Sequence, residues 1–148
     1  MILAIDPGRS KFGWAFVDDH KKLILSGITP TEELDSFISI LAKVSEKNFS
    51  NKWIMEFESA KTIPDFYRVV LGAGTGSKIF EKKLKVLLLP IHTINEKNST
   101  LEARDIYWKL HKPSVWQRLL PHSTIVPSRD IDDLAAYCLA LRYLDFSS

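Results

Sequence analysis

Two acidic residues near the end of the sequence are spaced as candidate metal ligands. Asp130 and Asp133 fall in the first turn of a predicted helix over residues 130–144. At about 100° per residue they share one side of that helix, whereas Asp132 points away from both. Carboxylates on one side repel each other, and a divalent cation would remove the repulsion. An explanation without a metal is that acids in a first turn complement the helix dipole, with Asp130 as the N-cap.

A third acid, Asp6, ends the first predicted strand. The apolar run Ile2–Ile5 is typical of a strand that is buried on both faces. A Pro-Gly turn follows Asp6 directly and leads to a second predicted strand at 12–17. The sequence therefore places a carboxylate at the end of a central strand, beside Arg9 and Lys11. Capping of the turn by Asp6 explains the same residues equally well.

The remaining pattern alternates between short apolar runs and amphipathic segments, which predicts an α/β fold. Glu56 lies near the carboxyl end of the fourth predicted strand, and Glu58 follows it. After the first two strands, the predicted elements are a strand at 23–27, a helix with apolar positions from 34 to 44, a strand at 53–57, a glycine-interrupted helical segment at 66–89, a strand at 91–94, a helix at 99–110 and the final helix.

Composition limits the class of protein. The 148 residues, 45% of them apolar, fit one globular domain spanning residues 1–148. A net charge of +2 is too small to identify a nucleic-acid binder by itself. A single cysteine, Cys138, excludes an intramolecular disulfide framework and a cysteine-based zinc cluster. With no charged leader and no apolar run of membrane-spanning length, we expect a soluble, cytoplasmic protein that does not bind membranes.

Two stretches of the sequence carry a family resemblance. They read Ile-Asp-Pro-Gly-Arg-Ser-Lys-Phe-Gly-Trp-Ala at 5–15 and Asp-Ile-Asp-Asp-Leu-Ala-Ala at 130–136. Together with the acid that ends the fourth predicted strand, they resemble the RNase H-like nucleases, specifically the RuvC-type Holliday junction resolvases and the related YqgF family. Carried over by position, the resemblance implies that the catalytic and metal-binding residues are Asp6, Glu56, Asp130 and Asp133.

The resemblance also implies an architecture, an RNase H-like fold with a five-stranded mixed sheet flanked by helices. Strands one to three would be antiparallel, and strands one, four and five would lie side by side and parallel, because helical crossovers connect three to four and four to five. Their carboxyl ends would share one edge, where open α/β sheets place ligands. We therefore expect the four acids to converge there and bind two Mg²⁺ or Mn²⁺ ions, about 4 Å apart, for phosphodiester hydrolysis.

The branch within the superfamily depends on two other segments. The glycine-containing segment after Glu56 is similar to the resolvase branch, which makes a Holliday junction resolvase the first hypothesis. Asn95-Glu96 followed by Ser-Thr-Leu-Glu-Ala at 99–103 is similar to the YqgF branch, where an Asp-Glu pair stands at this place. Asn95 replaces that Asp, so Glu96 is a second-tier candidate acid. The alternatives are a YqgF-like nuclease that processes pre-ribosomal RNA and an RNase H-like module that binds nucleic acid without cutting it.

Basic side chains would hold the nucleic acid, either branched DNA or structured RNA. Arg9 and Lys11 are the strongest candidates because they lie next to Asp6, and every other basic residue is also explained as solvated surface. A resolvase makes paired cuts in a symmetric junction, which predicts a two-fold homodimer, whereas the YqgF-like hypothesis allows a monomer. The predicted phosphate-binding residues are Arg9, Lys11, Lys78, Lys82, Lys112 and Arg118.

Overall fold

The computed structural model describes residues 1–43, 48–95, 97, 99–111 and 127–147. Over these residues it confirms the α/β class, with one six-stranded mixed sheet and four α-helices. The strands are β1 Ile2–Asp6, β2 Lys11–Val17, β3 Leu23–Pro30, β4 Ile54–Phe57, β5 Arg68–Gly72 and β6 Ile91–Ile94. The helices are α1 Leu34–Ala42, α2 Ser77–Leu84, α3 Ser99–Leu110 and α4 Asp132–Ser147, with short 3₁₀ turns at Thr31–Glu33, Asn51–Trp53 and Lys85–Leu87.

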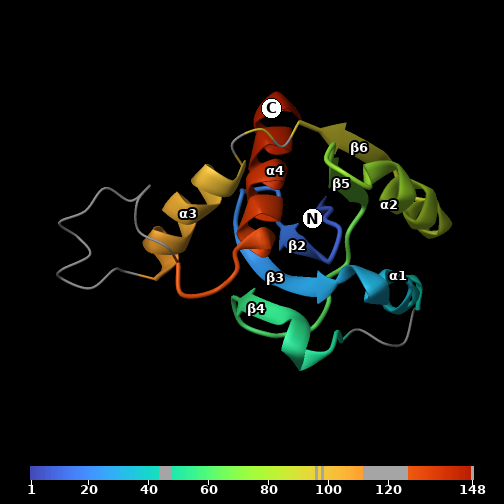
Figure 1. Ribbon diagram of the computed structural model, residues 1–148, viewed down its shortest axis with the longest axis horizontal. Helices are drawn as coiled ribbons and strands as arrows, with labels where there is room; N and C mark the ends of the chain where they lie inside the picture. The colour runs from blue at the N-terminus through green and yellow to red at the C-terminus, as the bar shows by residue number, and fades with distance from the viewer. Residues whose placement is uncertain (44–47, 96, 98, 112–126, 148) are drawn as a thin grey trace.

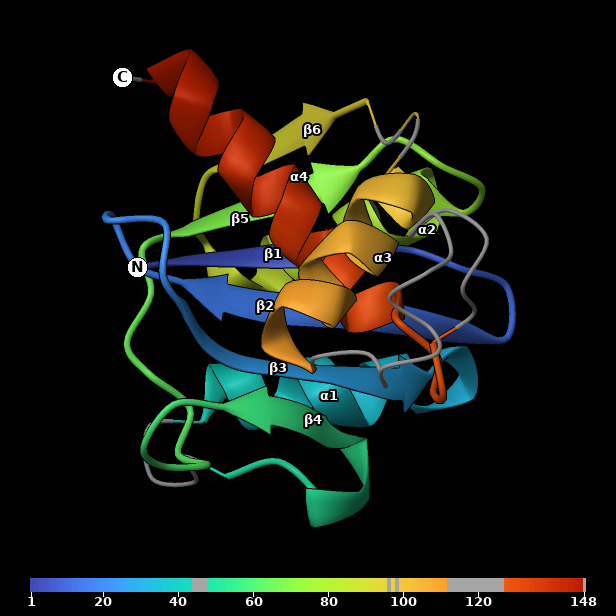
Figure 2. The same ribbon diagram turned by 90° about the vertical axis from the view of Figure 1, so that its left-hand side faces the viewer.

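The strand order in the sheet is β4-β3-β2-β1-β5-β6. The strands β1, β2 and β3 form the predicted antiparallel meander. The strands β1, β5 and β6 run parallel to one another. Helices α3 and α4 lie on one face of the sheet, and α1 and α2 lie on the other, so the molecule has three layers (Figures 1 and 2).

Two expectations about the sheet are wrong. It has six strands instead of five, because Arg68–Gly72, which was expected to be helical, is the strand β5 that pairs with β1. The predicted fourth strand forms as β4, but it lies at the outer edge and pairs antiparallel with β3. The short, β-branched run of β5 ends at the glycine-rich turn that leads into α2, so the glycines separate a strand from a helix instead of interrupting a helix.

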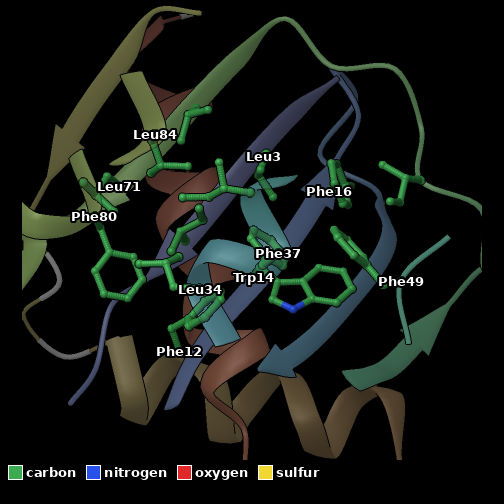
Figure 3. Close-up of a cluster of buried hydrophobic side chains, with 14 of the residues drawn as sticks. Leu3, Phe12, Trp14, Phe16, Leu34, Phe37, Phe49, Leu71, Phe80 and Leu84 are labelled. Atoms are coloured by element: carbon green, nitrogen blue, oxygen red, sulfur yellow. The ribbon is translucent and has the colours of Figure 1, made fainter. Parts of the chain in front are cut away.

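The central strand β1 is buried on both faces, as its uninterrupted apolar sequence predicts. Leu3 and Ile5 pack into one core beneath α1 and α2, which Figure 3 shows with its aromatic side chains. Ile2 and Ala4 face the opposite way, into a second core against α4. Because both faces are covered, β1 is fixed within the sheet, and the position of Asp6 at its end is fixed with it.

Close packing of α4 on β2 depends on Gly13, which is paired with Asp6 across the β1–β2 ladder. A Cβ added at Gly13 would lie 1.9 Å from the backbone oxygen of Asp132. The absence of a side chain therefore lets the start of α4 approach the end of β1. This contact brings the two candidate acidic segments, at the beginning and end of the chain, into one place.

Substitution of Gly13 by alanine is expected to lower the free energy of unfolding by about 2 kcal/mol, because α4 must move away from β2. Urea unfolding measures the loss. Gly76→Asn is the matched control, since Gly76 has a φ of 85°, which asparagine tolerates, and a Cβ added there would meet no described atom within 4 Å. Equal losses in the two variants would show that the close approach is not the cause.

Within the described residues, no helix has both the length and the apolar character required to cross a membrane.

Candidate functional site

A cleft of about 730 Å³ opens beside the carboxyl end of β1 and is lined from the sheet, from α3 and from the segment before α4. Asp6 lines it from the sheet, and Arg104 lines it from α3. The other lining residues are Lys11, Met55, Pro127, Ser128, Arg129, Asp130, Ile131, Asp132 and Ala135. The structure thus brings Asp6 and the acidic segment before α4 to one cleft, as the sequence predicted.

The helix α4 begins at Asp132, two residues later than expected. Asp130 therefore precedes the helix and is exposed, and it does not share a helix face with Asp133. Asp132, which was expected to point away, lines the cleft with Asp6. The pair that faces the cleft from this segment is consequently Asp130 and Asp132.

Lys11 joins these two acids. Its ammonium group, on the first residue of β2, forms an ion pair with Asp130 and lies 3.4 Å from the carboxylate of Asp132. The hydrogen bond to Asp130 raises the pKa of Lys11 above its ordinary value. Burial lowers this pKa, but by less. Lys11 therefore remains charged at neutral pH and supplies the positive charge that two neighbouring carboxylates need.

Asp133 is fully buried and faces the sheet instead of the cleft. Its carboxylate accepts a hydrogen bond of 2.6 Å from the hydroxyl of Ser26 on β3. It also accepts hydrogen bonds from both terminal nitrogens of Arg129, at 2.8 and 3.3 Å. The negative charge of Asp133 is thus compensated by Arg129, and its oxygens are hydrogen-bonded. A carboxylate can be buried under these conditions.

The same guanidinium group binds Glu56, on the edge strand β4. Arg129 Nη2 donates to Glu56 Oε1 at 2.9 Å, and His111 Nε2 also lies within hydrogen-bond distance of that oxygen. The expectation that Glu56 stands on a strand next to β1 is wrong, because β3 and β2 lie between β4 and β1. Glu56 does not line the cleft, and its role in the described structure is to pair with Arg129.

The Glu56 carboxylate has a pKa below its ordinary value of 4.5. Burial alone would raise this pKa, but the hydrogen bonds from His111 and Arg129 outweigh it. Since the folded-state pKa is lowered, the ionised Glu56 stabilises the fold above pH 4.5, and that stabilisation is lost as the pH falls through the lowered pKa.

We therefore expect Glu56→Gln to be less stable than the unchanged protein at pH 7, by about 1 kcal/mol or less because the carboxylate is partly exposed to water. The difference should disappear in acid, below the lowered pKa. Unfolding by urea between pH 7 and pH 3 measures it for both proteins. A difference that persists unchanged at pH 3 would show that the ionised form of Glu56 does not carry the effect.

The remaining predicted residues divide into two groups. Arg9 is exposed in the turn that follows β1, and Lys78 and Lys82 lie on α2, in the helical layer on the opposite face from α4. None of these three is among the residues that line the cleft. The second-tier acid Glu96 and the predicted phosphate-binding residues Lys112 and Arg118 lie outside the described residues.

Sequence reasoning missed Arg129, which organises the segment before α4. Its guanidinium group lies 5.6 Å from the centre of the Tyr107 ring on α3, and Ser128 is hydrogen-bonded to the Tyr107 hydroxyl at 2.7 Å. The sequence did contain one indication of this role. Arg129 lies four residues before Asp133, and side chains at that spacing can form an ion pair.

Carboxylate oxygens are the ligands that hard cations such as Mg²⁺ and Mn²⁺ prefer, so the acids of the cleft have the right chemistry for one such ion. The acids that line the cleft are Asp6, Asp130 and Asp132, together with the cations Lys11, Arg104 and Arg129. The predicted two-ion set does not fit, because Glu56 lies on β4 and Asp133 is buried against Arg129. In the part of the chain that the structure describes, no three acidic, histidine or cysteine side chains form a group that could hold a metal ion, so a cation at this cleft is a proposal about the chemistry of its acids.

Comparison with known proteins does not assign a family to the chain. No protein-family model matches the sequence, and no curated protein matches it significantly.

Proposed function

We propose that the protein is a metal-dependent endonuclease with an RNase H-like fold that hydrolyses phosphodiester bonds in structured RNA. One observation carries this proposal: Asp6 and Asp132, from opposite ends of the chain, line one cleft at the carboxyl end of the central strand. With β5 in the place of the expected fourth strand, the order β3-β2-β1-β5-β6 matches the arrangement that the sequence resemblance implies, with β4 added at the edge.

The two segments that distinguish the branches favour a YqgF-like enzyme over a resolvase. The resolvase hypothesis rested on a glycine-containing helical segment after Glu56, whereas Arg68–Gly72 is the strand β5 and the glycines lie at the turn into α2. Asn95 directly follows β6, which runs parallel to β5 and β1, so it leaves the sheet at the same edge as Asp6. That is the position of the Asp-Glu pair in the YqgF resemblance.

The residues of the cleft have separable tasks in this proposal. The carboxylates of Asp6, Asp130 and Asp132 would hold the cation, which would supply positive charge for activating water and stabilising the leaving oxygen. Lys11 and Arg104 border the same cleft and carry the charge and donors that phosphate oxygens bind. The main contribution of the protein is therefore to position the phosphodiester beside fixed charges.

The test is cleavage of end-labelled substrates by the purified protein with Mg²⁺, Mn²⁺ or EDTA. A structured precursor-ribosomal RNA fragment and a four-way DNA junction are supplied side by side. Metal-dependent cutting of the RNA alone is the expected result. Cutting of the junction alone would instead favour the resolvase hypothesis, and binding of either substrate without cutting would reject the nuclease assignment.

A non-catalytic nucleic-acid-binding module is the second candidate, and a specific observation favours it. Lys11 pairs with Asp130 and Asp132, and Arg129 pairs with Asp133 and Glu56. Two internal cations therefore already compensate four of the acids. Such a protein would bind RNA with the affinity of the nuclease but show no metal-dependent cutting.

A further inference from the structure

We infer that a groove on the face of the sheet covered by α1 and α2 binds a partner protein, through an acidic, amphipathic helix of that partner. The groove runs between α1 and α2, together with the 3₁₀ turn Lys85–Leu87 that follows α2, and we call it the α1–α2 groove. It lies on the opposite face from α3 and α4 (Figure 2). No described residue lines both this groove and the cleft, so docking here is independent of the proposed function.

The shape of the groove is the first observation. Two hollows of about 440 and 280 Å³ share Ala42 and Val86 as lining residues, so they form one continuous groove. Aliphatic side chains of α1 line it, among them Ile38, Ile40 and Leu41. A concave apolar surface of this kind accepts the side chains of a bound helix.

Exposed aliphatic side chains beside the groove are the second observation. Ile79, Val86 and Leu88 are 61%, 62% and 91% exposed, whereas Phe80 and Leu84 hold the other side of α2 in the core. Leu88 also has a φ of 56°, a left-handed conformation that is strained for a leucine. Among the described residues, nothing covers these three side chains, and adjoining exposed apolar groups are typical of an interaction surface.

The charge around the groove is the third observation. Lys78, Lys82 and Lys85 are exposed on α2 and the turn after it, and none of them has an ion pair with a described carboxylate. Lys83 lines the groove and is already paired with Asp35. The excess of positive charge opposes contact with a second copy of the same face, and it complements an acidic partner.

The combination of lysines with aliphatic side chains identifies the class of partner. RNA would satisfy the lysines, but proteins bind unpaired bases on aromatic rings and guanidinium groups, and the exposed apolar side chains here are aliphatic. An anionic membrane would satisfy both groups, but its surface does not fill a groove. A helix with apolar residues at i, i+3, i+4 and i+7 and acids beside them satisfies the lysines, the aliphatic side chains and the groove together.

The experiment measures fluorescence anisotropy of a labelled helix-forming peptide with leucines along one side and glutamates beside them. One control peptide has lysine in place of each glutamate, and another has the same composition with leucines that do not share a side. The acidic peptide should bind at least about tenfold more tightly than either control. Its affinity should fall as salt is added, because salt screens the attraction of the lysines.

Variants of the protein locate the binding site. Leu88→Asn should weaken binding of the acidic peptide at least about tenfold, and asparagine tolerates the left-handed conformation, so the fold should persist. The double variant Lys82→Glu with Lys85→Glu should prefer the lysine peptide instead. Leu101→Asn and Lys109→Glu are the matched controls, because both residues are exposed on α3, on the opposite face. Thermal unfolding shows that each variant is folded.

Several outcomes would overturn the inference. One is equal binding of the three peptides, and another is equal weakening by the α3 variants. Binding of phosphatidylserine vesicles or of an RNA hairpin that depends on Lys82 and Lys85, without binding of the acidic peptide, would assign the face to a membrane or to RNA. A dimer in sedimentation that Leu88→Asn dissociates would identify a second copy of the chain as the occupant.

Discussion

Replacement of Arg129 by methionine is expected to lower the free energy of unfolding by about 3 kcal/mol, because removal of one partner of a buried ion pair leaves the other charge without compensation. Asp133 is fully buried, and among the hydrogen bonds of the described residues it would keep the one from Ser26. Glu56 would lose its contact with the guanidinium group and keep the one with His111. Urea unfolding at pH 7 measures the effect.

Two further variants test whether the buried charge is the cause. Arg129→Met combined with Asp133→Asn removes both charges and should recover part of the lost stability. Lys83→Met breaks an exposed ion pair with Asp35 and should cost less than about 1 kcal/mol. If Arg129→Met were no less stable than Lys83→Met, the network of Arg129 with Asp133 and Glu56 would not stabilise the fold.

The centre of the sheet was predictable because its residues have only one favourable arrangement. The apolar run Ile2–Ile5 must be covered on both faces, and a Pro-Gly turn must reverse the chain after it. The structure confirms the antiparallel meander β1-β2-β3 and the burial of both faces of β1. Local sequence was sufficient there, because each strand pairs with its neighbour in the chain.

The position of β4 could not be predicted from local sequence. A strand of four residues can add to either edge of a sheet, and its neighbours depend on contacts between segments that are distant in the chain. The strand β5 was not predicted either, because the glycines at 72–76 were assigned to the interior of a helical segment. Once Arg68–Gly72 is a strand, it takes the place beside β1 that was expected for Ile54–Phe57.

The candidate site was predictable in its segments but not in its pairs. Asp6 and the acids near Asp130 do meet at one cleft. A shift of two residues in the start of α4, however, changes which acids share a side, so Asp132 replaces Asp133 at the cleft. The pairing of Lys11 with Asp130 joins residues far apart in sequence. The periodicity of apolar residues along the chain does not indicate a contact of this kind.

Substitution of Asp6 by asparagine is expected to reduce metal-dependent cleavage of structured RNA by at least about 10³-fold, because it removes a negative charge from the cleft while keeping the shape of the side chain. The half-buried Asp6 ends a strand whose other residues form the core, so the fold should persist. Binding of RNA should persist as well, because phosphates bind to cations. Single-turnover cleavage measures the first effect, and thermal unfolding and RNA affinity measure the others.

A matched set of variants identifies which acids form the site with Asp6. Asp132→Asn should reduce cleavage to a similar extent, because Asp132 lines the same cleft, whereas Asp145→Asn, at an exposed position late in α4, should leave cleavage unchanged. Glu56→Gln distinguishes the cleft from the four-acid set that the sequence suggested. Glu56 pairs with Arg129 on the edge strand, so its loss should affect stability more than cleavage. Cleavage that is abolished by Glu56→Gln but retained by Asp132→Asn would reject the cleft as the catalytic site and restore the original set.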